Sequence, residues 1–90
     1  MKEVKFIAKI TPYKEVILFF PEDYHIRNNT VPAFCLSDGH FDASYDYYRH
    51  KCRNPKPHEE ETVQSLIRFY EYDYPLVQLC RIRRFSWRMK

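Results

Sequence analysis

Apolar and polar residues alternate near the start of the chain. Four apolar positions are separated by single residues that are mostly polar, and this period of two predicts a strand over residues 4–10 with one buried face. The alternating apolar positions are Val4, Phe6, Ala8 and Ile10. Residues 11–14 predict a turn, and the unbroken apolar run that follows within residues 15–20 predicts a central strand covered on both faces.

The middle of the chain passes from a loop to a helical pattern. Residues 21–32 hold two Pro and two Asn and predict a long surface loop, and residues 33–37 predict a short third strand that ends at the turn signal Asp38-Gly39. Large side chains then recur at helical spacing, at Phe41, Tyr45, Tyr48 and Cys52. They predict a first helix with Asp42 at its N-cap, which must end before the prolines at positions 55 and 57.

A second helix is predicted after these prolines. Glutamates occupy positions 59, 60 and 61, in the first turn, where the helix dipole favours negative charge. The apolar face follows with spacings of three and four residues, at Val63, Leu66, Ile67 and Tyr70. Pro75 ends the helix, and residues 76–84 predict a closing strand rich in apolar and basic residues.

This order of elements predicts one small α+β domain over residues 1–90, with a basic C-terminal end at 81–90. We expect an antiparallel sheet in the order β-β-β-α-α-β, with both helices packed on one face. The opposite face would then present Ile7, Ile17 and Phe19. Either the loop at 21–32 folds back over these side chains, or they form the interface of a homodimer or of a complex with a larger protein.

Cysteine content and hydropathy bear on the compartment. The chain has three Cys, an odd number spread far apart, which favours a reducing environment over a disulfide framework. The N-terminus alternates charged and apolar residues and lacks the apolar segment of a signal peptide. The longest apolar run is too short to cross a bilayer, so we expect no membrane span and a cytoplasmic location.

Charge distribution gives the sharpest indication of function. Residues 81–90 carry five positive charges, no acid and two large aromatic residues, whereas the whole chain has a net charge of +3. Residues 49–57 add four positive charges without an acid. Together the two segments predict a surface that binds nucleic acid, with cations on phosphates and aromatic rings stacked on bases. The predicted binding residues are Arg49, Lys51, Arg53, Lys56, Arg81, Arg83, Arg84, Arg88, Tyr48 and Trp87. The alternative is an ordinary surface on which acidic and basic segments neutralise each other.

Few residue patterns point to catalysis or to metal binding. With one glycine, the chain has no phosphate-cradling loop, so we expect no nucleotide cofactor. The only close pair of metal ligands is His50-x-Cys52, whose spacing separates the two side chains on a helix, so no metal is expected either. A non-catalytic binding module is therefore predicted. A small ribonuclease that uses His40, His50 and His58 as acid and base stays open as a third hypothesis.

A resemblance adds context to these patterns. The stretch from Val16 to Glu22, the Gly39-His40 pair after Cys35, and the residues from Ala43 to Arg49 resemble small uncharacterised proteins encoded on bacterial mobile elements and phages. The resemblance covers about residues 16–50 and carries no known activity or site residues. It implies an accessory protein in a bacterium or bacterial host cell, one that binds nucleic acid or inhibits a host protein.

Overall fold

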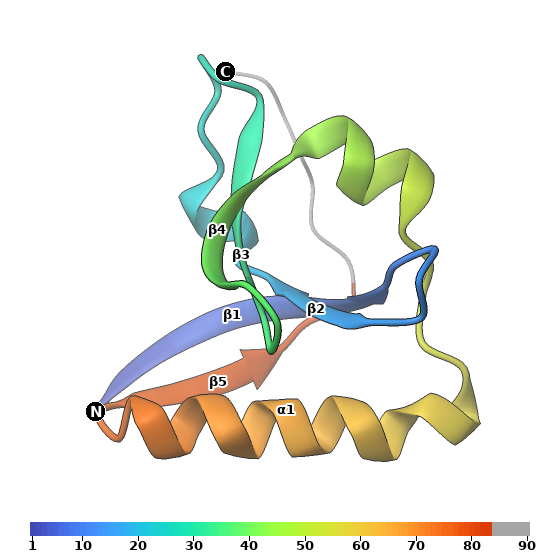
Figure 1. The fold of residues 1–90 in the computed structure, drawn as a ribbon. Helices are drawn as coiled ribbons and strands as arrows, with labels where there is room; N and C mark the ends of the chain where they lie inside the picture. Colours follow the sequence, from blue (N-terminus) through green and yellow to red (C-terminus); the bar gives the residue numbers. More distant parts are fainter. Residues whose placement is uncertain (84–90) are drawn as a thin grey trace.

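Five strands form one sheet, and a single long helix, α1 (Glu60–Asp73), lies along one of its faces (Figure 1). The computed structural model describes residues 1–83. The strand order across the sheet is β4-β3-β2-β1-β5. The strands are β1 (Lys2–Ile10), β2 (Val16–Phe19), β3 (Thr30–Cys35), β4 (Gly39–Ser44) and β5 (Val77–Arg81). The predicted α+β class is therefore confirmed.

The first two strands form as their patterns predict. β1 pairs antiparallel with β2, and all four residues of β2 are buried because it is the middle strand of the sheet. The turn between them is closed by the buried side chain of Thr11. Its Oγ1 accepts hydrogen bonds from the backbone N–H groups of Tyr13 (3.1 Å) and Glu15 (3.2 Å). This buried hydroxyl is thus hydrogen-bonded and holds the turn.

Helix α1 confirms the second predicted helix. A short 3₁₀ turn, Pro57–Glu59, leads into it, and its predicted apolar side chains Val63, Leu66 and Tyr70 are buried. They pack on the sheet face that carries alternate residues of β1 and β2. This first core contains Phe6, Ala8, Ile10, Val16, Leu18, Phe20, Phe34, Val63, Leu66 and Tyr70.

The predicted all-antiparallel sheet is wrong, because β5 runs parallel to β1. The turn after α1 explains this direction. The N–H of Val77 donates to the carbonyl of Tyr74 (3.0 Å), and the N–H of Lys2 donates to the carbonyl of Leu76 (2.8 Å). β5 therefore begins beside the start of β1, and the two strands run the same way along the sheet.

The predicted first helix is also wrong. Its first half is β4, an edge strand in which Phe41 and Ala43 point toward one face in the two-residue period of a strand. Its second half is a short π-helical turn, η2 (Tyr47–Lys51). β3 pairs with β4 along its whole length, and these ladder hydrogen bonds outweigh the helical spacing of the side chains. The third strand also begins earlier than predicted, at Thr30.

A second core lies on the sheet face away from α1, which we call the aromatic face. η2 covers it (Figure 1), with Tyr48 packed edge-on against Phe19 at 4.8 Å between ring centroids. Ile7, Ile17 and Phe19 are 3%, 3% and 0% exposed, so the expectation that they form an open interface is wrong. Tyr24, from the predicted loop at 21–32, also packs against this core. The chain thus buries both faces of its own sheet.

Candidate nucleic-acid interface

Two basic segments far apart in the sequence reach the same edge of the sheet. Arg81 pairs with Phe6 of β1, and the N–H of Ile82 donates to the carbonyl of Phe6 (2.9 Å). Farther along the same strand, Ile10 and Arg53 exchange two backbone hydrogen bonds of 2.7 and 2.9 Å. Arg53 and residues 81–83 therefore lie against neighbouring stretches of β1, whereas Arg49 and Lys51 belong to η2.

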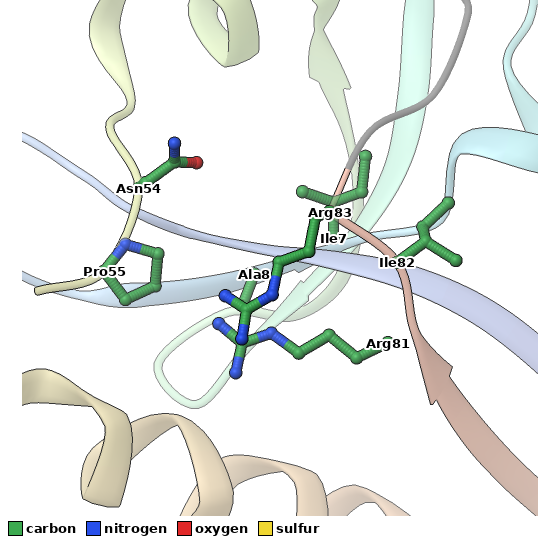
Figure 2. Close-up of a pocket in the computed structure, with 7 residues that line it drawn as sticks. All are labelled: Ile7, Ala8, Asn54, Pro55, Arg81, Ile82 and Arg83. Atoms are coloured by element: carbon green, nitrogen blue, oxygen red, sulfur yellow. The ribbon is translucent and has the colours of Figure 1, made fainter. Parts of the chain in front are cut away.

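A small pocket opens between these two segments (Figure 2). Its volume is about 190 Å³. Basic side chains from the end of β5 line one part of it, and the chain after η2 lines another. The lining residues are Ile7, Ala8, Asn54, Pro55, Arg81, Ile82 and Arg83. We call this surface, together with the neighbouring Lys9 and Lys56, the basic edge.

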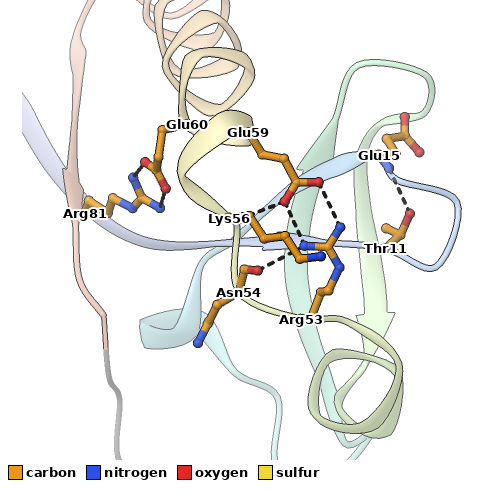
Figure 3. A network of polar contacts seen from close by, with 8 residues as sticks. All are labelled: Thr11, Glu15, Arg53, Asn54, Lys56, Glu59, Glu60 and Arg81. Atoms are coloured by element: carbon orange, nitrogen blue, oxygen red, sulfur yellow. Dashed lines mark hydrogen bonds and ion pairs between the residues drawn. The ribbon is translucent and has the colours of Figure 1, made fainter.

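Two of the predicted phosphate ligands are already paired with acids (Figure 3). Arg53 donates two hydrogen bonds to Glu59, at 2.7 and 2.8 Å, and Arg81 binds Glu60 in the same bidentate way. The bond from Arg53 lowers the pKa of Glu59 to about 2, and the bond from Arg81 lowers the pKa of Glu60. Both acids therefore stay ionised at neutral pH, and both arginines tie the first turn of α1 to the rest of the fold.

Other predicted cations are exposed. Lys51 and Lys56 lie at the surface, as does Arg83, and no described residue forms a hydrogen bond or ion pair with any of their side-chain nitrogens. Arg49 is also exposed and donates to the hydroxyl of Tyr45 (3.1 Å). Among the predicted binding residues within 1–83, these four have exposed cationic groups that no carboxylate engages.

Lys9 is a cation that the sequence patterns did not single out. Its Nζ donates to Oδ1 of Asn54 (2.7 Å) and lies 5.3 Å from the centre of the Tyr48 ring. Partial burial lowers its pKa, while the nearby Cys52 acts in the opposite direction. The alternating pattern of the strand gave no indication that Lys9 contacts Asn54, because Asn54 is 45 residues away in the chain.

Tyr48, predicted to stack on a base, is buried in this structure. Its side chain is 8% exposed and belongs to the core of the aromatic face, between Phe19 and Lys9. A ring buried on this scale cannot stack on a base unless η2 moves. Arg84, Trp87 and Arg88, the other predicted ligands near the C-terminus, lie outside the described residues.

The histidines are not gathered into a catalytic group. His40 packs among aromatic rings next to α1, at 5.1 Å from Phe34 and 5.4 Å from Tyr70 between ring centroids. His50 belongs to η2, on the opposite face of the sheet. Within residues 1–83, no group of three or more His, Cys, Asp or Glu side chains is placed to hold a metal ion.

An apolar groove lies away from the basic edge, between α1 and the turns that lead into β2 and out of β3. Its volume is about 390 Å³. Phe69 and Leu36, which are 44% and 65% exposed, lie along it. The remaining lining residues are Lys14, Glu15, Val16, Thr62, Ser65 and Leu66. This groove offers apolar surface to a partner, whereas the face of Ile7, Ile17 and Phe19 is buried.

Comparison of the chain with protein-family models, with curated proteins and with solved structures finds no match. Among the described residues, no helix has both the length and the apolar character needed to span a bilayer.

Proposed function

We propose that the chain is a non-catalytic module that binds nucleic acid through its basic edge. One observation carries this proposal: Arg53 and residues 81–83 lie against neighbouring stretches of β1, and Asn54 and Pro55 line one pocket with residues 81–83. Charges that are distant in sequence and adjacent in space form a continuous attraction for a phosphate backbone, whereas scattered charges do not.

The basic residues of the basic edge and of the adjoining segment 49–53 would have different roles. Arg83, Lys56 and Lys51 would neutralise phosphates, because their cationic groups are exposed and form no hydrogen bond or ion pair with a described residue, although Arg83 also helps to lower the pKa of Glu60. Arg53 and Arg81 would hold the edge in shape through Glu59 and Glu60. Arg49 would add charge beside η2. Arg84, Arg88 and Trp87 stay in the proposal on the strength of the sequence alone, with Trp87 replacing Tyr48 as the residue that stacks on a base.

Fluorescence anisotropy with labelled single-stranded DNA, duplex DNA and RNA tests this proposal. We expect binding at low salt that weakens by orders of magnitude between about 50 and 200 mM salt, because bound cations release condensed counterions. RNA should remain intact throughout. The double variant Arg83→Ala/Lys56→Ala should bind several-fold more weakly, and its dependence on salt should fall by about one unit of log–log slope for each lost phosphate contact.

The control variant is Arg68→Ala, which removes an exposed positive charge from α1. It changes the net charge but leaves the basic edge intact, so it should bind nearly as well as the unmodified chain. If Arg68→Ala weakens binding as much for each charge removed as Arg83→Ala/Lys56→Ala does, the interaction is nonspecific charge attraction. If no probe binds at low salt, the proposal fails.

A second candidate is favoured by the apolar groove beside Phe69. Exposed apolar surface of this kind is typical of protein–protein interfaces, which suits an accessory or inhibitory protein of a phage or mobile element. The partner would present large apolar side chains to Phe69 and Leu36, with an acid placed to meet Lys14 at the rim.

The test of this second candidate compares the proteins captured from a bacterial lysate by the unmodified chain, by Phe69→Lys and by Tyr72→Lys. The last variant alters a side chain that is 84% exposed on the same helix. A partner lost with Phe69→Lys and retained with Tyr72→Lys would support this candidate.

A further inference from the structure

The outer edge of β4 carries backbone groups with no partner in the described chain. The N–H of Phe20 donates to the carbonyl of Pro32 (2.9 Å), so the even-numbered residues of β3 face β2 and the odd-numbered ones face β4. In the β3–β4 register, the odd-numbered residues of β3 pair with Gly39, Phe41 and Ala43. The backbone N–H and C=O groups of His40 and Asp42 therefore point away from the sheet, where no residue within 1–83 bonds to them.

The opposite edge of the sheet is closed in a way that β4 is not. On β5, the outward N–H of Val77 donates to the carbonyl of Tyr74 (3.0 Å), and that of Leu79 donates to the carboxylate of Glu71 (2.8 Å). α1 and the turn after it thus block β5 from adding another strand. β4 contains no Lys, no Pro and no bulge, the features that usually protect an edge strand.

We propose that β4 pairs with β4 of a second copy of this chain, antiparallel and around a two-fold axis. His40 would lie opposite the partner's Asp42, and Phe41 would lie opposite the partner's Phe41. The two sheets would join into one continuous sheet. Each basic edge lies at the far side of its own sheet from β4, so the dimer would carry one at each end.

Side-chain complementarity selects this register over its neighbours. The outward residues of β4 are even-numbered, so the neighbouring antiparallel registers place Asp42 opposite the partner's Asp42, or His40 opposite the partner's His40. Two carboxylates directly opposite each other destabilise a strand pair, and two imidazoles opposite each other leave the Asp42 carboxylate without the imidazole N–H as a donor. The proposed register instead forms two symmetric pairs of unlike groups, and both His40 and Asp42 are exposed and point to the same face of the sheet.

Disulfide trapping tests the register of the proposed β4–β4 pair directly. Three variants, Phe41→Cys, His40→Cys and Asp42→Cys, each add one exposed-edge cysteine and are prepared with Cys52→Ser and Cys80→Ser, while Cys35 stays in place because it is 1% exposed. In the proposed register Phe41 faces the partner's Phe41 as a non-hydrogen-bonded pair, at about 4.5 Å between Cα atoms, which a disulfide can bridge. Mild oxidation should therefore cross-link Phe41→Cys into a dimer much faster than either control.

Sedimentation velocity over a wide concentration range tests the dimer without added cysteines. The native chain should show reversible dimerisation. Asp42→Pro should be monomeric, because it removes an outward N–H and no hydrogen bond of the β3–β4 ladder. Asp42→Lys should also be monomeric, because it removes the carboxylate that would face the partner's His40. Far-UV circular dichroism identifies any variant that fails to fold.

Two results would overturn the proposal. The first is a native chain that remains monomeric at every concentration, which would leave β4 open to an extended segment of a different protein. The second is faster cross-linking of His40→Cys or Asp42→Cys than of Phe41→Cys, which would show another register.

Discussion

Replacing Tyr48 by alanine tests the assignment of this residue to the core of the aromatic face. Its ring is 8% exposed, packs edge-on against Phe19, and stacks against Tyr45 at 6.0 Å between ring centroids. Truncating a buried aromatic side chain to alanine costs about 3–5 kcal/mol, of which about 0.5–1.5 kcal/mol belongs to the aromatic pair. A domain of this size has about 5–14 kcal/mol of total stability, so the loss is a large share of it.

Urea unfolding followed by far-UV circular dichroism measures this loss. The control is Tyr72→Ala, the same substitution at a side chain that is 84% exposed, which should change stability by about 0.5 kcal/mol or less. A cycle of Tyr48→Leu, Phe19→Leu and the double variant isolates the energy of the ring pair. A cost below about 1 kcal/mol for Tyr48→Ala, close to that of the control, would contradict the assignment of Tyr48 to the core.

Three further predictions concern single groups. The hydrogen bonds from Arg53 lower the pKa of Glu59 from 4.5 to about 2, so their stabilisation is complete above about pH 4.5 and is lost as the pH falls through about 2. As the pH falls from about 4.5 to about 2, the free energy of unfolding measured by urea titration should therefore decrease less for Glu59→Gln than for the native chain. Equal decreases would contradict the pairing of Arg53 with Glu59. Burial raises the pKa of the Cys52 thiol from 9.0 to about 11. Alkylation of Cys52 at mildly alkaline pH should then be about a hundredfold slower in the folded chain than in denaturant, and similar rates would argue against this burial. Glu71→Ala should speed amide hydrogen exchange at Leu79, whose N–H loses its carboxylate acceptor; unchanged protection would show that this bond does not close the edge.

The elements that the sequence predicted correctly are those whose local pattern allows one interpretation. The alternation before Thr11 suits only a strand, and the acids and apolar stripe of α1, bounded by prolines, suit only a helix. The segment after Gly39 was ambiguous because its aromatic residues fit a helix while Phe41 and Ala43 also fit a strand. Pairing with β3, which depends on residues earlier in the chain, resolved the ambiguity.

The same distinction between local pattern and tertiary contact applies to the candidate site. The sequence by itself determined which segments carry the charge, because a run of Arg and Lys without an acid is a local property. Only the tertiary structure decided that the two segments meet at β1, that Glu59 and Glu60 engage two of the arginines, and that Tyr48 is buried. Each of these depends on residues brought together by strand pairing and helix packing, and spacing along a single chain does not encode such contacts.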